Sequence, residues 1–399
     1  MVIGIEMINI DNRKVTGRFA FLDLGFRPFF LGAAGFAVLS ILVWMGVLVF
    51  GWKIRFNGLS PVTWHAHEMI YGYGLAVVAG FLLTAISNWT DRPTLNGVPL
   101  LLLFLLWAAG RIVPFLGSVA PLEFATATDT LFMVVLLLSA TWPVVKARQW
   151  EQWGILLILA LMLAGNLIFY LGALHLLQNG VSLGLYSGLY LILALILTMG
   201  RRVIPTFIER GVGYPVKLKN WKWLDVSSLF LFLVFWIADL RMPNAAPVAL
   251  LAGILFVLHG ARLAAWYTHG LWKKPLLWVL YLAYGSLVAG FALKTAVFVF
   301  NISPYLAVHA FTVGGIGLMT IGMMARVSLG HTGRNVLDPP AELFWMFALL
   351  FVGGIVRVFF PLMAPSHYWV WIGLSQAFWI VSFAMFLYVY FPMLVRPEA

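Results

Sequence analysis

The chain has 399 residues, of which 63% are hydrophobic and only 10% charged, with a formal net charge of +11. One water-soluble core cannot bury that much apolar surface, so the composition excludes a soluble globular protein and indicates a polytopic membrane protein. The chain has no cysteine. This excludes disulfides, iron–sulfur clusters, thiolate metal ligands and cysteine nucleophiles.

Apolar runs of roughly 20 residues, long enough to cross about 30 Å of hydrocarbon, recur along the whole chain. We predict an all-α membrane bundle of twelve transmembrane helices, at residues 29–50, 65–87, 98–116, 124–145, 154–177, 184–208, 221–240, 246–267, 276–300, 306–328, 341–362 and 369–395. The chain then divides into a cytoplasmic N-terminal segment, 1–28, and one transmembrane domain, 29–395. The N-terminal segment lacks an apolar core followed by a small-residue cleavage site, so we expect no removable signal peptide.

Lys and Arg give the expected orientation, because positive loops stay on the cytoplasmic side. Placing both termini in the cytoplasm puts most of the loop Lys and Arg there and leaves only Lys53, Arg55 and Arg241 outside. The positive charge is therefore a signal of membrane topology and of attraction to anionic lipid, and it gives no reason to expect nucleic acid. We predict a multi-pass protein of a bacterial inner membrane.

Three histidines are expected near the outer surface, at the start of predicted spans 2 and 10. His65 and His67 lie in TWHAHEMIYGYG, and His309 lies in SPYLAVHAF. Imidazole is a usual ligand of haem iron and copper. Residues two apart on a helix point about 200° away from each other, so His65 and His67 should serve different partners.

Glycines follow His67 and His309 at the same intervals. Because small residues let a backbone approach a flat macrocycle, we predict that His67 and His309 ligate one haem, with His65 as a further candidate ligand. The alternative is that the glycines only permit close helix packing. The glycines concerned are Gly72, Gly80, Gly314 and Gly322.

For each of the other polar side chains within the spans, the sequence allows two interpretations of its role. Arg111, Lys294 and Arg357 are candidate partners of haem propionates or cations that snorkel to the interface. Glu68 and Asp129 are candidate proton carriers or interhelical hydrogen-bond partners, and buried His259 is either a ligand or a structural residue. The thioethers of Met319, Met323 and Met324 are candidate copper ligands or core filling.

A second polar group is expected at the cytoplasmic boundary. His309 and His331 are roughly 33 Å apart along a helix that rises 1.5 Å per residue, so one site cannot hold both. This group suits a second cofactor or a proton path, while positive-inside bias is its simpler explanation. Its members are Arg27, Arg201, Arg202, Arg326, His331 and Arg334.

Four sequence blocks resemble the NnrS family of bacterial membrane proteins: FRPFF at 26–30, WHAHEM at 64–69, GRRVIPTF at 200–207 and VHAFTVGGIGLMTIGMMARVSLGHTGR at 308–334. The resemblance implies a twelve-helix inner-membrane protein that contains haem and copper and is linked to nitric oxide, nitrosative stress and denitrification. Carried over to this chain, it points to His65, His67, His259, His309 and His331 and to the arginines of the same blocks. Tyr170 and Tyr281 stand where histidines of the family are expected, which weakens the case for copper.

Three functions follow from these observations. The first is a haem b protein that binds or turns over nitric oxide near the outer side, between spans 2 and 10. The second is a nitric oxide reductase with haem and copper that takes electrons from quinol. The third is a secondary transporter, for which inverted repeats would be the signature, and none is evident.

Overall fold

The computed structural model describes residues 20–397, and within that range it is all-helical, with 12 helices long and apolar enough to span a membrane. This confirms the predicted fold class and number of spans. The helices are α1 (Phe26–Leu48), α2 (Pro61–His67), η1 (Glu68–Gly74), α3 (Leu75–Thr90), α4 (Gly97–Ile112), α5 (Leu122–Lys146), α6 (Trp153–Ala173), α7 (Gly180–Gly211), α8 (Lys222–Arg241), α9 (Ala246–Ala265), α10 (Pro275–Phe300), α11 (Pro304–His309), η6 (Ala310–Gly317), α12 (Leu318–Gly330), α13 (Glu342–Met363) and α14 (Tyr368–Val395). Short 3-10 turns occur at Val113–Phe115, Gly117–Val119, Trp150–Gln152, His269–Lys273 and Pro365–His367.

The first span begins at Phe26, three residues before the predicted start at 29. Arg27 and Pro28 interrupt the apolar run, but proline is compatible with the first turn of a helix because the N–H that it lacks has no helical partner there. Of the predicted segment 1–28, residues 1–19 lie outside the described residues.

Spans 2 and 10 share an architecture that hydropathy does not predict. Each begins with proline and a short α-helix that ends at a histidine, His67 or His309, and each continues as a π-helix, η1 or η6, before returning to α-helix. We refer to α2, η1 and α3 together as span 2, and to α11, η6 and α12 together as span 10. A π-helical insertion within an α-helix is rare and occurs frequently at functional sites.

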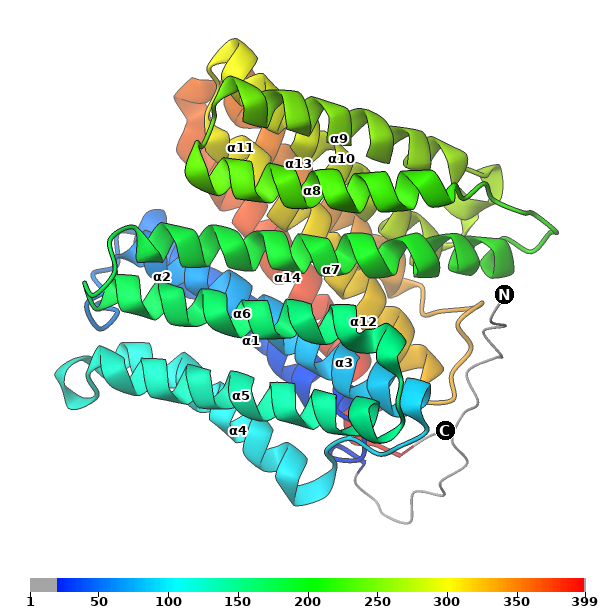
Figure 1. The fold of residues 1–399 in the computed structure, drawn as a ribbon, viewed down its shortest axis with the longest axis horizontal. Helices are drawn as coiled ribbons and strands as arrows, with labels where there is room; N and C mark the ends of the chain where they lie inside the picture. Colours follow the sequence, from blue (N-terminus) through cyan, green and yellow to red (C-terminus); the bar gives the residue numbers. More distant parts are fainter. Residues whose placement is uncertain (1–19, 398–399) are drawn as a thin grey trace.

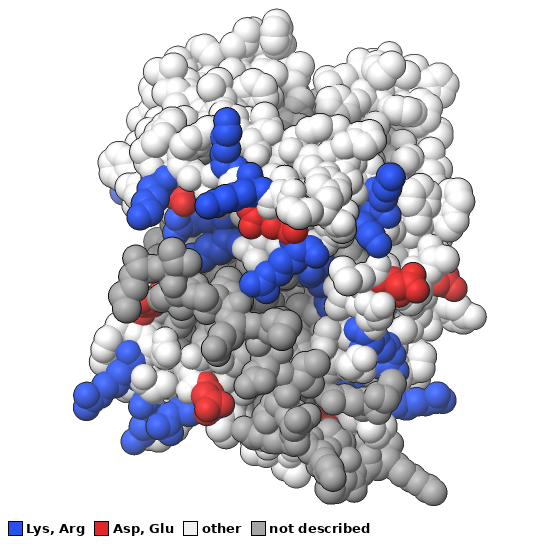
Figure 2. Space-filling view, turned by 90° about the vertical axis from the view of Figure 1, so that its right-hand side faces the viewer, with Lys and Arg blue, Asp and Glu red and all other residues white. Residues whose placement is uncertain are grey.

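The helices run side by side, and both termini of the described chain lie at one end of the bundle (Figure 1). The ends are joined there, because the Ala20 N–H donates to the Val395 carbonyl over 3.1 Å. We call this end the terminal face and the opposite end the far face. Figure 2 looks onto the terminal face and shows Lys and Arg side chains spread over it, as expected of a cytoplasmic surface. The side of the membrane that it faces stays a prediction.

Spans 2 and 10 are the most buried spans of the bundle. Their glycines do not face one another across a gap. A methyl group added at Gly72 or Gly80 would meet side chains of α1 and α4, and one added at Gly314 or Gly322 would meet side chains of α10. The prediction that these glycines line one flat macrocycle is therefore wrong for this arrangement, and close helix packing explains them.

Candidate functional site

Two of the three outer histidines, His65 and His309, lie near each other toward the far face. Arg357 of α13 interacts electrostatically with both imidazoles, and the two imidazoles interact with each other. The ring of His65 stacks flat on Trp44 of α1, with centroids 4.6 Å apart and an interplanar angle of 6°. His65, His309 and Arg357 are half-buried. We call these three residues the far-face site.

The hydrogen bonds of His309 fix which of its nitrogens carries the proton. Nδ1 lies 2.6 Å from the carbonyl oxygen of Tyr305, which can only accept, so Nδ1 is the donor. Nε2 lies 3.1 Å from a guanidinium nitrogen of Arg357, which can only donate. The Nε2 lone pair therefore accepts from Arg357, and the hydrogen bond from Nδ1 to a backbone carbonyl is the kind that orients a metal-ligating imidazole.

One ring nitrogen of His65 has no hydrogen-bond partner in the described chain. This nitrogen, Nδ1, is buried. A buried polar atom without a partner costs on the order of 1–3 kcal/mol. The far-face site thus combines one imidazole that has a nitrogen without a partner, a second imidazole whose Nε2 is held only by Arg357, and the Arg357 cation.

His67 lies in a different cluster, which we call the Arg111 cluster. Its Nδ1 is 3.2 Å from Oε1 of Glu68, its Nε2 is 2.9 Å from Oδ1 of Asn166, and its ring stacks on Phe169 at 4.3 Å. Both nitrogens already have protein partners, and those partners come from η1 and α6. The structure therefore does not bring His67 and His309 together, and the pair of histidines that it does bring together is His65 with His309.

Arg111 holds the rest of this cluster together. Its guanidinium forms ion pairs with Glu68 and with Asp129, and the Tyr170 hydroxyl donates to the second oxygen of Asp129 over 2.6 Å. All of these side chains are buried. Arg111 was expected to snorkel or to bind a propionate, but its charge is already neutralised by two carboxylates within the bundle.

Lys294 and His259 belong to two further networks. Lys294 forms a 2.8 Å ion pair with Asp239 of α8, so it is neither a free cation nor one at the interface. The Nδ1 of His259 is 2.6 Å from the Tyr284 hydroxyl, and Nε2 is buried with no partner in the described chain. Arg262 joins His259 and Tyr284 to Asp225 near the terminal face.

The arginines predicted to form a second site do not converge. Arg27 donates to the carbonyls of Met393, Leu394 and Arg396 and so caps the last span, at 2.8–3.2 Å. Arg201 pairs with Asp225 at 3.0 Å.

Of the remaining members of this predicted second site, His331 lies near Arg27, and the others are dispersed. Arg326 lies over the ring of Phe207 at 3.7 Å, and Arg334 donates to its neighbour Thr332. Arg202 is exposed, and His331 packs on Phe26 at 5.7 Å. Most of these side chains are tied to local partners at the ends of helices.

Sequence reasoning missed several residues of both clusters. Asn166 is the only polar side chain of its type within α6 and could have been noticed as such. Tyr305 acts through its backbone carbonyl, which every residue has. Trp44 has the position of an ordinary interfacial tryptophan. The sequence therefore does not mark either residue as part of a site. Among the described residues 20–397, no group of three or more His, Asp or Glu side chains is placed to hold a metal ion.

Comparison with known proteins bears on the whole bundle. A search of curated proteins found no match. A scan against protein families matched the family described as NnrS protein over residues 20–398, which is nearly the entire chain. The match covers all twelve spans together with the far-face site and the Arg111 cluster, and the chain belongs to the NnrS family.

Proposed function

We propose that the protein binds a b-type haem near the outer side of a bacterial inner membrane, between spans 2 and 10, and that it handles nitric oxide there. His65 and His309 would hold the haem. The observation that carries the proposal is the nearness of these two imidazoles at the far-face site, with Nε2 of His309 held only by Arg357 and Nδ1 of His65 without a partner in the described chain. His67 is left out of the proposed ligand pair, because its two nitrogens are held by side-chain oxygens of Glu68 and Asn166 inside the Arg111 cluster, whereas Nε2 of His309 is held only by Arg357, a member of the far-face site itself.

The residues of the site fit a haem in charge as well as in ligands. Imidazole is a usual ligand of haem iron. Arg357 has no ion pair with a carboxylate among the residues that the structure describes, and a guanidinium suits a propionate. Bound haem would supply the iron atom that takes up nitric oxide. The protein's part is to orient His309 through the Tyr305 carbonyl and to fix His65 against Trp44.

The membrane location suits the ligand. Nitric oxide is a small uncharged molecule that enters a bilayer without a transporter, so a site within the far half of the spans can be reached through lipid. The positive charge of the terminal face favours a cytoplasmic position for that face, which places the far-face site at the outer side.

Visible spectra of purified protein test the proposal. Wild-type protein should show a Soret band that is lost or shifted in His309→Ala and in His65→Ala, while both variants elute as folded protein. His269→Ala is the matched control, because His269 is exposed at the terminal face, and its spectrum should equal that of wild type. Unaltered spectra in both far-face variants would refute the assignment of ligands.

A second candidate function is reduction of nitric oxide with electrons from quinol, and one observation favours it. This reaction consumes protons, and the Arg111 cluster places two carboxylates and an imidazole within the bundle near the same end. Copper would be the second metal. Formation of nitrous oxide by purified protein with a reduced quinol analogue tests it, and product no higher than in a haem-free control would remove it.

A further inference from the structure

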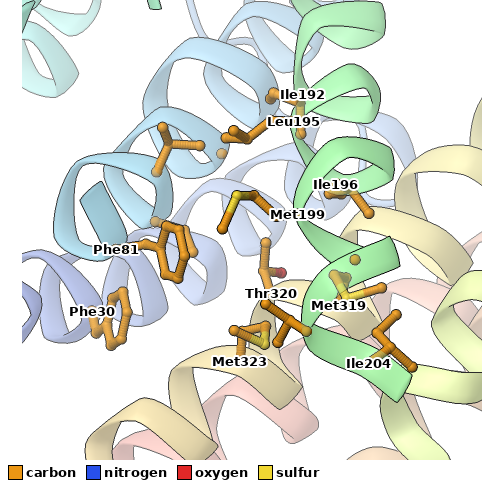
Figure 3. A pocket seen from close by; sticks show the side chains of 15 residues that line it. Phe30, Phe81, Ile192, Leu195, Ile196, Met199, Ile204, Met319, Thr320 and Met323 are labelled. Carbon is orange, nitrogen blue, oxygen red and sulfur yellow. The ribbon is translucent and has the colours of Figure 1, made fainter. Parts of the chain in front are cut away.

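A partly open cavity of about 90 Å³ lies between α1, span 2, α7 and span 10. Its walls are almost entirely apolar. Figure 3 shows Phe30 and Phe81 on one side and the α7 residues Ile192, Ile196 and Ile204 on the other. Three methionines, Met199, Met319 and Met323, also line it.

The packing of α7 explains why the cavity is there. α7 packs closely against η1 and η6, but only sparsely against α3 and α12, which continue the same two spans toward the terminal face. Beyond the π-helices the three spans therefore separate. The cavity occupies the space between them, next to Gly74 at the end of η1 and Thr320 just after η6.

The polar group in the wall has no hydrogen left to donate to a ligand. Thr320 donates its only hydroxyl hydrogen to a backbone carbonyl, Ile316 at 2.7 Å or Gly317 at 2.9 Å. The Tyr73 hydroxyl, at 2.5 Å, therefore donates to the Thr320 oxygen. Water needs two to four polar partners to occupy a cavity, and voids that lack them stay dry and accept apolar guests such as xenon or benzene.

From this we infer that the cavity between span 2, α7 and span 10 is a binding site for a small, uncharged, apolar molecule of the size of a diatomic gas or a xenon atom. The volume suits a guest of this size, and the thioethers of three methionines provide polarisable contacts for it. A charged ligand would find no counter-charge in these walls, and a ligand that accepts hydrogen bonds would find no donor among the lining side chains.

Under the proposed function, nitric oxide is such a molecule, and that identification rests on the proposed function. The cavity then holds nitric oxide within the bilayer part of the protein, on the terminal side of the Tyr73–Thr320 bridge. The binding of an apolar guest depends only on the lining and does not require haem.

Crystals of the purified protein under xenon pressure test the site. The wild-type protein should show an anomalous peak among Met199, Met319 and Phe81. Val203→Phe places a ring in the cavity and should abolish the peak. The matched control is Val381→Phe, the same substitution on a residue of α14 that is 45% exposed, and it should keep the peak.

Three results would overturn the inference: no xenon peak in wild type, an equal peak in Val203→Phe, or elongated density of a lipid acyl chain that xenon does not displace. If Val203→Phe fails to fold, Ile196→Phe fills the same cavity from the same helix. A second measurement tests nitric oxide itself. Xenon should reduce the fraction of nitric oxide that returns to haem after photolysis, and protein without haem would fail this measurement while leaving the xenon peak in place.

Discussion

His65 and His67 are two residues apart in the same span, yet their surroundings differ in kind. His67 is fully buried, and each of its nitrogens faces an oxygen of another side chain. His65 is half-buried, stacked on a tryptophan, with one nitrogen that has no partner in the described chain and with a cation and a second imidazole nearby. About 200° of helix rotation separates them, which is why they enter different interfaces.

The difference shows which of the two clusters is ready for a ligand. In the Arg111 cluster one guanidinium is paired with two carboxylates, and the hydroxyl and imidazole groups complete the network. Breaking such a buried network is costly, so it holds the helices in register. In the far-face site the cation has no carboxylate partner among residues 20–397, Nδ1 of His65 has no hydrogen-bond partner there, and Nε2 of His309 is held only by that cation. Variants of the Arg111 cluster should therefore lose stability, whereas variants of the far-face site should lose the haem spectrum.

The largest expected effect is that of Arg111→Met. It would leave Glu68 and Asp129 buried without their cation, and removing one partner of a buried ion pair costs on the order of 3–5 kcal/mol. We expect a marked loss of folded protein and a lower unfolding temperature. Intrinsic tryptophan fluorescence measures the unfolding temperature. The control is Arg241→Met, because Arg241 is exposed at the end of α8.

The triple variant Arg111→Met, Glu68→Gln, Asp129→Asn separates the effect of the buried charges from the effect of side-chain shape on stability. It removes the cation and both anions together, so it should recover part of the stability lost in the single variant. A single variant as stable as wild type would show that the cluster does not hold the helices together.

The next effect compares His67→Ala with His65→Ala directly. His67→Ala should lower the free energy of unfolding by about 1–3 kcal/mol, since it leaves buried oxygens without a partner, and should leave the Soret band in place. His65→Ala should change the Soret band with little change in unfolding temperature. The reverse pattern would mean that the haem site is at the Arg111 cluster and not at the far-face site.

The fold could be predicted from the sequence almost completely. Hydropathy depends on windows of roughly 20 residues, and it located the twelve spans to within a few residues of their observed ends. The π-helices η1 and η6 were not predictable this way, because hydropathy is insensitive to which backbone carbonyl each N–H reaches. Matched glycine spacing after His67 and His309 was a real signal of shared architecture, but each set of glycines faces a different neighbour.

The candidate site was predictable only in part. Position in the chain and expected orientation brought His65, His67 and His309 to the same end of the bundle, which was enough to make them candidates. Choosing between His65 and His67 needed the rotation of span 2 relative to α6 and α13. That rotation follows from packing with helices about 100 and 290 residues away in the chain, Asn166 and Arg357 being the contacts concerned.

Tyr73→Phe should have a smaller effect. The Tyr73 hydroxyl bonds to Thr320 and is a direct link between spans 2 and 10. Hydrogen bonds between membrane helices contribute on average about 0.6 kcal/mol and at most about 1.7 kcal/mol, so the unfolding temperature should fall slightly. Tyr388→Phe, at a residue that is 81% exposed, is the control and should change nothing. Equal unfolding temperatures for the two variants would mean that the bridge contributes no stability.

The smallest effect concerns pH and lies at the terminal face, where His331 follows the last residue of span 10. Burial lowers the pKa of His331 below its ordinary value of 6.5, and the positive charge of Arg27 lowers that pKa further. Below about pH 6.5 the unfolded chain therefore binds this proton more readily than the folded chain, so the contribution of His331 to stability is lost as the pH falls and is fully present above that value. His331→Phe should remove this loss, so its unfolding temperature should fall less than that of wild type between about pH 7.5 and 5.5. His269→Phe, at an exposed histidine of the same face, should follow wild type; if His331→Phe also follows wild type, the protonation of His331 does not contribute to the acid sensitivity of the fold.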